Sequence, residues 1–107
     1  MLNIKEMIKD IEEDYTRDVN KQDSKYALAK LWDNYYDEDP DEEMLLYNLI
    51  IAHFNIKSGE VTSGQKKCIM DVLNIYNMLR EDVEKCLDVE DNMMLSEMIE
   101  YIKNGLN

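Results

Sequence analysis

The sequence predicts an all-helical protein, a single domain over residues 1–107 folded as a bundle of about five helices. Three glycines and one proline among 107 residues are too few for a turn-rich β fold. Leucine, isoleucine, methionine, glutamate and lysine, which favour helices, are abundant. Apolar residues recur three and four positions apart along most of the chain. Hydrophobic residues make up 45% of the chain, which is enough to bury a core.

The first predicted helix covers residues 2–18 and presents lysine and carboxylate side chains opposite an apolar stripe. That stripe consists of Ile4, Met7, Ile8, Ile11 and Tyr15. A second helix is predicted over residues 24–38, capped by Asp23 or Ser24. Its stripe consists of Leu28, Leu31, Trp32 and Tyr35. We expect it to end before Asp39, because Pro40 disfavours a helical residue before it.

The third helix is expected to begin with Asp39 as its cap and Pro40 in its first position, while Glu42 closes a capping box. Gly59 is expected to end it. This helix is apolar on most sides, which predicts that it is the central and most buried one. Its apolar and aromatic residues are Leu45, Leu46, Leu49, Ile50, Ala52, His53, Phe54 and Ile56.

The fourth helix is predicted to start after Thr62, which serves as its cap with Gln65 as the capping-box partner. Its stripe consists of Ile69, Val72, Leu73, Tyr76 and Leu79. Residues 79–87 either continue this helix or form a short separate one. Residues 89–92 are expected to break the chain direction, and a last helix is predicted to end at Gly105. The last stripe consists of Met94, Leu95, Met98, Ile99 and Ile102.

The charge balance restricts the class of partner. Twenty-four acidic against 12 basic residues give a formal net charge of −12. Such a surface repels phosphates, which argues against nucleic acid and anionic membranes as partners. It favours a cationic protein partner, since opposite charge speeds association. Solubility alone is the competing explanation for the charge.

A cytoplasmic location is expected. The first turn carries Asn3, Lys5 and Glu6 instead of the basic and then apolar start of a signal peptide. The most apolar stretch, Met44–Ala52, is too short to span a bilayer. The only cysteines, Cys68 and Cys86, form no metal-binding or disulfide motif and are expected to be reduced thiols.

No catalytic, cofactor-binding or metal-binding residue is predicted, and the chain is not expected to be an enzyme. His53 is the only histidine and is expected to be partly buried among apolar residues. It would need Cys68 or Cys86 beside it for nucleophilic catalysis. The acidic run from Asp37 resembles the start of a calcium loop, but Glu42 replaces the required glycine and Asn48 the required glutamate.

The same acidic run is predicted to contact a protein partner, because tyrosines offer rigid contact area and carboxylates complement Arg or Lys. The partner-binding residues expected are Tyr35, Tyr36, Asp37, Glu38, Asp39, Asp41, Glu42 and Glu43. A solvated loop before a capped helix is the alternative interpretation. A second acidic group, residues 12–14, is interpreted as the solvent face of the first helix. The eight methionines are interpreted mainly as core residues rather than as an adaptable groove.

Residues 45–73 resemble a known family. An apolar helix with Leu49, Ala52 and Phe54 leads into residues 57–61, Lys-Ser-Gly-Glu-Val, and a second helix opens with paired lysines at 66 and 67. This pattern is similar to small helical immunity proteins of bacterial polymorphic-toxin and contact-dependent growth inhibition systems. The resemblance implies a cytosolic protein that neutralises a toxin domain by binding it, and many such toxins are nucleases with basic clefts.

Two other functions fit the composition. One is a phage or mobile-element inhibitor that mimics nucleic-acid charge, of the anti-restriction or anti-CRISPR type. The other is a non-catalytic helical regulatory subunit whose apolar surface is its interface. The neighbouring gene separates the first of these from an immunity protein, since a toxin gene directly upstream favours immunity.

Overall fold

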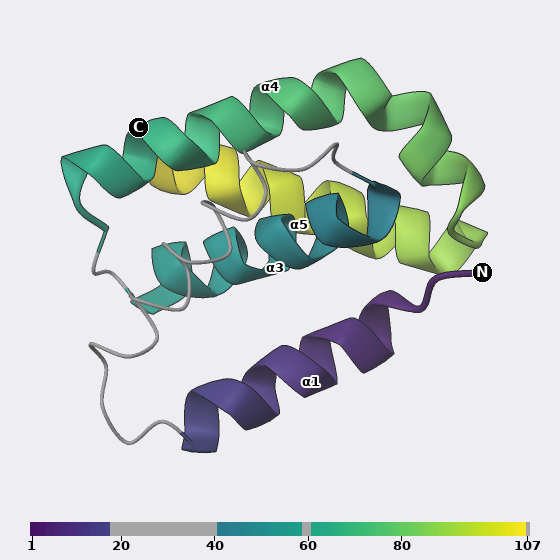
Figure 1. Cartoon of the computed structure of the whole chain (residues 1–107), viewed down its shortest axis with the longest axis horizontal. Helices are drawn as coiled ribbons and strands as arrows, with labels where there is room; N and C mark the ends of the chain where they lie inside the picture. The colour runs from purple at the N-terminus through teal and green to yellow at the C-terminus, as the bar shows by residue number, and fades with distance from the viewer. Residues whose placement is uncertain (18–40, 59–60, 107) are drawn as a thin grey trace.

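The computed structural model describes residues 1–17, 41–58 and 61–106, which form four helices and no strand (Figure 1). These are α1 (Ile4–Arg17), α3 (Glu42–Ser58), α4 (Ser63–Lys85) and α5 (Val89–Leu106). The all-helical prediction is confirmed for this part of the chain. The number of helices is one below the predicted five, because the helix predicted over residues 24–38 lies outside the described residues. The predicted cap at Gly59 also lies outside them.

Helix α3 is the centre of the fold, as predicted. It contacts each of the other three helices and lies between α1 and α4 (Figure 1). Its buried side chains point in all directions around the helix, so no solvent face interrupts them. They are Leu45, Leu46, Asn48, Leu49, Ile50, Ile51, Ala52 and Asn55.

The other three helices each bury one apolar face against this centre. The predicted stripes of α1, α4 and α5 coincide with the buried residues, apart from Ile8, Leu79 and Met94, which are partly buried against the core. The side chain of Tyr15, also in the first predicted stripe, lies outside the described part of the structure. The buried members are Ile4, Met7, Ile11, Ile69, Val72, Leu73, Tyr76, Leu95, Met98, Ile99 and Ile102.

Helices α1, α3 and α5 run in the same direction, and α4 runs in the opposite one (Figure 1). Two contacts agree with this arrangement. The start of α1 meets the start of α5 where Ile4 N donates to Asp91 Oδ2, at 3.3 Å. The end of α3 meets the end of α5 where Ile56 lies against Gly105. The starts of three helices therefore gather at one end of the bundle.

The predicted start of the third helix is wrong by two residues. Helix α3 begins at Glu42, and Asp41 rather than Asp39 caps it. The Asp41 Oδ1 atom accepts a hydrogen bond from Met44 N at 2.7 Å, and the Asp41 carbonyl accepts one from Leu45 N at 3.1 Å. Glu42 is consequently in the first helical position, where it cannot close the predicted capping box.

Of the two alternatives for residues 79–87, continuation of the fourth helix is confirmed, whereas the break predicted at residues 89–92 is wrong. Helix α4 continues through residue 79 to Lys85, so no separate helix forms there. Residues 89–92, predicted as a break, are the first turn of α5. Asp88 explains the difference, since its Oδ1 accepts from Asp91 N at 2.8 Å and its carbonyl accepts from Asn92 N at 3.0 Å. An aspartate in this position is an effective helix cap.

Two further predictions on helix ends have opposite outcomes. The capping box at the start of α4 is confirmed: Thr62 Oγ1 accepts from Gln65 N at 3.2 Å, and Gln65 Oε1 accepts from Thr62 N at 3.0 Å. Gly105 does not end the last helix, which continues to Leu106. A Cβ atom at position 105 would overlap Ile56 Cγ2, so the glycine allows α5 to pack closely on α3.

Within the described ranges, no helix has both the length and the apolar character needed to cross a bilayer. Cys68 and Cys86 are both free thiols and partly buried, as predicted from their spacing.

Candidate functional site

Three of the eight predicted partner-binding residues lie in the described structure. Asp41 and Glu43 are exposed and Glu42 is half-buried, and together they form the start of α3. The other five, at positions 35–39, lie outside the described residues. Because the Asp41 carboxylate caps α3, it has a structural role that the sequence assigned to Asp39. Glu42 and Glu43 lie in the first helical turn, where carboxylates complement the helix dipole.

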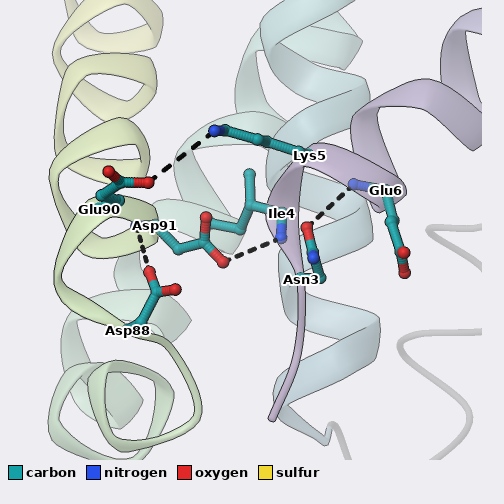
Figure 2. Close-up of polar contacts among 7 residues, drawn as sticks. All are labelled: Asn3, Ile4, Lys5, Glu6, Asp88, Glu90 and Asp91. Carbon is teal, nitrogen blue, oxygen red and sulfur yellow. Dashed lines mark hydrogen bonds and ion pairs between the residues drawn. The ribbon is translucent and has the colours of Figure 1, made fainter.

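The junction of α1, α4 and α5 is built from polar contacts at the end of the bundle where α1 and α5 start (Figure 2). Asn3 caps α1, since its Oδ1 accepts from Glu6 N at 3.2 Å. The buried Asp91 accepts from Ile4 N, as described above, while its own N–H is capped by Asp88. The Asp91 carboxylate thus lies at the positive ends of two helix dipoles, which stabilise its charge.

Two more contacts close this junction around the end of α4. Leu2 N donates to the carbonyl of Cys86 at 3.0 Å. The Asn92 Nδ2 atom donates to the carbonyls of Glu84 and Leu87, at 3.1 and 3.3 Å. The carbonyls left unpaired at the end of α4 are therefore bound by side chains and backbone from α5 and the N-terminal segment. Because these hydrogen bonds hold the three helix ends together, we interpret the polar residues of the junction as structural.

The outer face of α5 has a different character, because large apolar side chains are exposed there beside carboxylates. Met93 is 63% exposed and Tyr101 is 44% exposed. One helix residue corresponds to 100°, so positions 90, 93, 97, 101 and 104 fall on one narrow stripe, with 100 at its border. We call this stripe the α5 outer face. Its residues are Glu90, Met93, Glu97, Glu100, Tyr101 and Asn104, all exposed.

Tyr101 connects this face to α3. Its ring lies 4.9 Å from the His53 ring, centroid to centroid, and the His53 ring in turn meets Phe54 edge-on at 5.5 Å. A surface hollow of about 420 Å³ opens beside Tyr101. It is lined by Ser96, Glu97, Glu100, Tyr101 and Asn104. One aromatic ring and two carboxylates thus border a single depression in the surface.

His53 is partly buried, as predicted. Burial lowers the pKa of its imidazole, and the nearby Lys57 ammonium lowers it further. The Nδ1 atom is enclosed and has no hydrogen-bond partner among the described residues. Cys86 lies before the start of α5. Tyr101, which contacts His53, lies 12 residues along α5, about 18 Å from the start of that helix. Cys86 is therefore too far from His53 to be its catalytic partner.

The whole chain, residues 1–107, matches the family model described as immunity protein Imm3. The chain belongs to the Imm3 family. No curated protein and no solved structure matches the chain. The resemblance to immunity proteins drawn from residues 45–73 is therefore confirmed at the level of the family.

Membership of the Imm3 family gives the chain a broad function. It is an immunity protein, and its partner is a toxin protein. The family agrees with the expectation of a binding protein instead of an enzyme. It also favours immunity over the alternative of a phage or mobile-element inhibitor.

The α5 outer face of this Imm3 protein was not predicted from the sequence. Met93 is adjacent to the core residue Met94, and the methionines were interpreted mainly as core. That interpretation is correct for Met7 and Met98, which are buried, and for the partly buried Met94. Four methionines are instead exposed, namely Met1, Met70, Met78 and Met93. The signal that could have found the face is the spacing of Met93, Glu97 and Tyr101, four residues apart and opposite the buried stripe.

Proposed function

We propose that this Imm3 protein neutralises a cationic toxin domain, of the nuclease type, by covering its basic surface with an acidic one. The observation that carries the proposal is the formal net charge of −12 on a chain whose family acts on toxins. A nuclease binds phosphates through basic residues, so an acidic protein of this size complements its cleft. We place this activity in the cytoplasm of bacteria that use contact-dependent or related polymorphic toxins.

The residues Tyr35–Glu43 are proposed to contribute to this acidic surface. Asp41 and Glu43 support the proposal, because both side chains are exposed at the start of α3. Asp41 also caps α3, so its replacement would affect stability as well as binding. Variants that test binding should therefore leave Asp41 unchanged.

The test of the function first asks whether a toxin gene lies directly upstream of this gene, and then uses the toxin domain that it encodes. The wild-type protein should co-purify with that domain and, at equal molar amounts, abolish its degradation of nucleic acid. The toxin domain alone should degrade nucleic acid. If it binds the immunity protein but does not degrade nucleic acid on its own, the nuclease assignment is contradicted. Failure to form a complex would contradict the proposed function itself.

The test of the acidic segment is a charge reversal at Asp37, Asp39 and Glu42 to Lys. We expect the association rate with the toxin domain to fall and its dependence on salt to weaken. The matched control reverses three exposed acids elsewhere, Asp10→Lys on α1 with Glu81→Lys and Asp82→Lys on α4, and so changes the net charge equally. Equal association rates for the two triple variants would exclude a specific role for the segment.

A further inference from the structure

Helix α5 exposes large apolar side chains that do not pack in the core. Helix α5 is held to the core by its opposite side, where Leu95, Met98 and Ile102 are buried. Met93 and Tyr101 contribute little to that core, yet they expose large apolar surfaces at 63% and 44%. Two large apolar side chains exposed beside carboxylates on one helix face make this face a candidate interaction surface.

The charge of this face selects its partner. Glu90, Glu97 and Glu100 lie on it, and its basic neighbours among the described residues are Lys5, Lys103 and Lys57, the last one turn from His53 on α3. Lys5 reaches Glu90 from α1, with a separation of 3.8 Å. Lys103 lies about 120° around the helix from Glu97, on the side that borders α4. A second copy of this chain would bring like charges together, which disfavours a homodimer through this face.

The exposed apolar residues of α4 provide a comparison. Met70 and Met78 are 55% and 84% exposed, but α4 places Asn74 and Asn77 between them. The groove at Met70 is lined by Lys103 as well. That surface combines apolar area with amides and a base, so it lacks the paired carboxylates that adjoin Tyr101 on the α5 outer face.

The hollow beside Tyr101 shows which group of the partner the face fits. The depression is shallow and open to solvent, Tyr101 lines it, and the Tyr101 ring contacts the His53 ring of α3. The carboxylates of Glu97 and Glu100 lie at the same depression. A guanidinium group stacks on aromatic rings and binds carboxylates through paired hydrogen bonds, whereas an ammonium does so less well. The hollow has room for one such side chain.

We propose that the α5 outer face docks the cationic toxin domain, with an arginine side chain of the toxin inserted between Tyr101, Glu97 and Glu100. This inference rests on the proposed function and adds a described surface to the acidic segment at residues 35–43. Met93, one turn from Glu97, contacts an apolar neighbour of that arginine. The partner segment is therefore basic with an apolar residue beside its arginine.

The experiment measures the dissociation constant of the complex with the upstream-encoded toxin domain for four variants. Glu97→Lys with Glu100→Lys should weaken binding about 100-fold, since it replaces attraction by repulsion at the hollow. Tyr101→Ala should weaken binding about 30-fold, as expected for a central aromatic anchor. The controls are Glu81→Lys with Asp82→Lys, which gives the same change in net charge on α4, and Met78→Ala, which removes an exposed apolar side chain there.

The outcomes separate this inference from the proposed function. Tight wild-type binding that only the α5 variants weaken supports both. If the α5 double reversal weakens wild-type binding no more than the α4 double reversal does, the docking face is overturned and the proposed function is not. No wild-type binding overturns the proposed function and the docking face together. Because Glu97 and Glu100 are exposed, their reversal leaves the fold intact, which the thermal midpoint verifies.

Discussion

Gly105 shows how one residue can have a role that its type does not reveal. A glycine near the end of a helical pattern predicts a helix end, and Gly105 was accordingly predicted to end the last helix. In the structure it lies inside α5, and the absence of a Cβ atom allows the helix to approach Ile56. Its role depends on a residue of another helix, 49 positions earlier, which no local pattern contains.

Gly105→Ala should therefore destabilise the protein. The added methyl overlaps Ile56 Cγ2, and overpacking of this kind costs about 1–3 kcal/mol. Gly64→Ala is the matched control, because no atom lies within 4 Å of a Cβ atom there, and it should be neutral or slightly stabilising. Urea denaturation measures both. Removing the overlapping methyl with Ile56→Ala should make the Gly105→Ala change harmless, and a double variant that shows no such coupling would contradict the close approach.

His53 should make stability depend on pH. Its pKa is lowered in the folded protein by burial and by Lys57, so the unfolded chain binds the proton more readily. The stabilisation is thus complete above the unfolded pKa of 6.5 and decreases as the pH falls below it toward the folded pKa. The free energy of unfolding, measured by urea denaturation between about pH 7.5 and 5, should fall for the wild type. His53→Gln should remove this part of the slope, and parallel curves would contradict it.

At the scale of helices, Asp91 fixes how α1 meets α5. Its buried carboxylate accepts the hydrogen bond from Ile4 N (Figure 2). Asp91→Ala leaves this N–H without its acceptor and should cost about 1–3 kcal/mol. The neighbouring Glu90→Ala breaks only an exposed pair with Lys5 and should cost less than about 0.5 kcal/mol.

Hydrogen exchange distinguishes a local from a global effect of Asp91→Ala. The amide of Ile4 should lose protection, while amides at the centre of α3 should follow the global stability. Asp91→Asn retains a side-chain oxygen acceptor and should recover part of the loss. Equal protection of Ile4 in the wild type and the alanine variant would show that the contact does not hold α1.

A feature of a helix was predictable from the sequence when the pattern that determines it lies within that helix. The buried stripes and the Thr62 cap were predictable, because periodicity and a capping box involve neighbours within one helix. The start of α3 was not, since Asp39 and Asp41 are both competent caps and the local sequence does not decide between them. The first turn of α5 was missed because its acids resemble a loop.

The candidate sites were predictable to a different degree. Net charge and the family resemblance predicted a toxin partner without any structure. The predicted stripe of the last helix already placed Met94 and Ile102 toward the core, and their burial confirms it. The spacing of Met93, Glu97 and Tyr101 on the opposite side was thus available from the sequence. The contact of Tyr101 with His53 was not, because it depends on the packing of α5 on α3.

At the scale of the whole molecule, the charge predicts how a toxin approaches. With a net charge of −12, the association rate constant with a cationic toxin domain should fall about tenfold or more between low and high salt. The dissociation rate should change less. Stopped-flow mixing with the upstream-encoded domain measures both rates. An association rate that is flat with salt would show that charge plays no part in steering.

The parallel arrangement of α1, α3 and α5 has a consequence for the direction of that approach. Three positive helix ends lie at one end of the bundle, where Asp41, Asp88 and Asp91 are bound to backbone N–H groups (Figure 1). At close range these helix ends partly offset the charge of the three carboxylates that they bind. Glu97 and Glu100 lie far from any helix start, so no helix end offsets their charge in this way. Under the proposed docking, an incoming cationic toxin therefore meets carboxylates on the flank of α5 whose charge is not offset by a helix dipole.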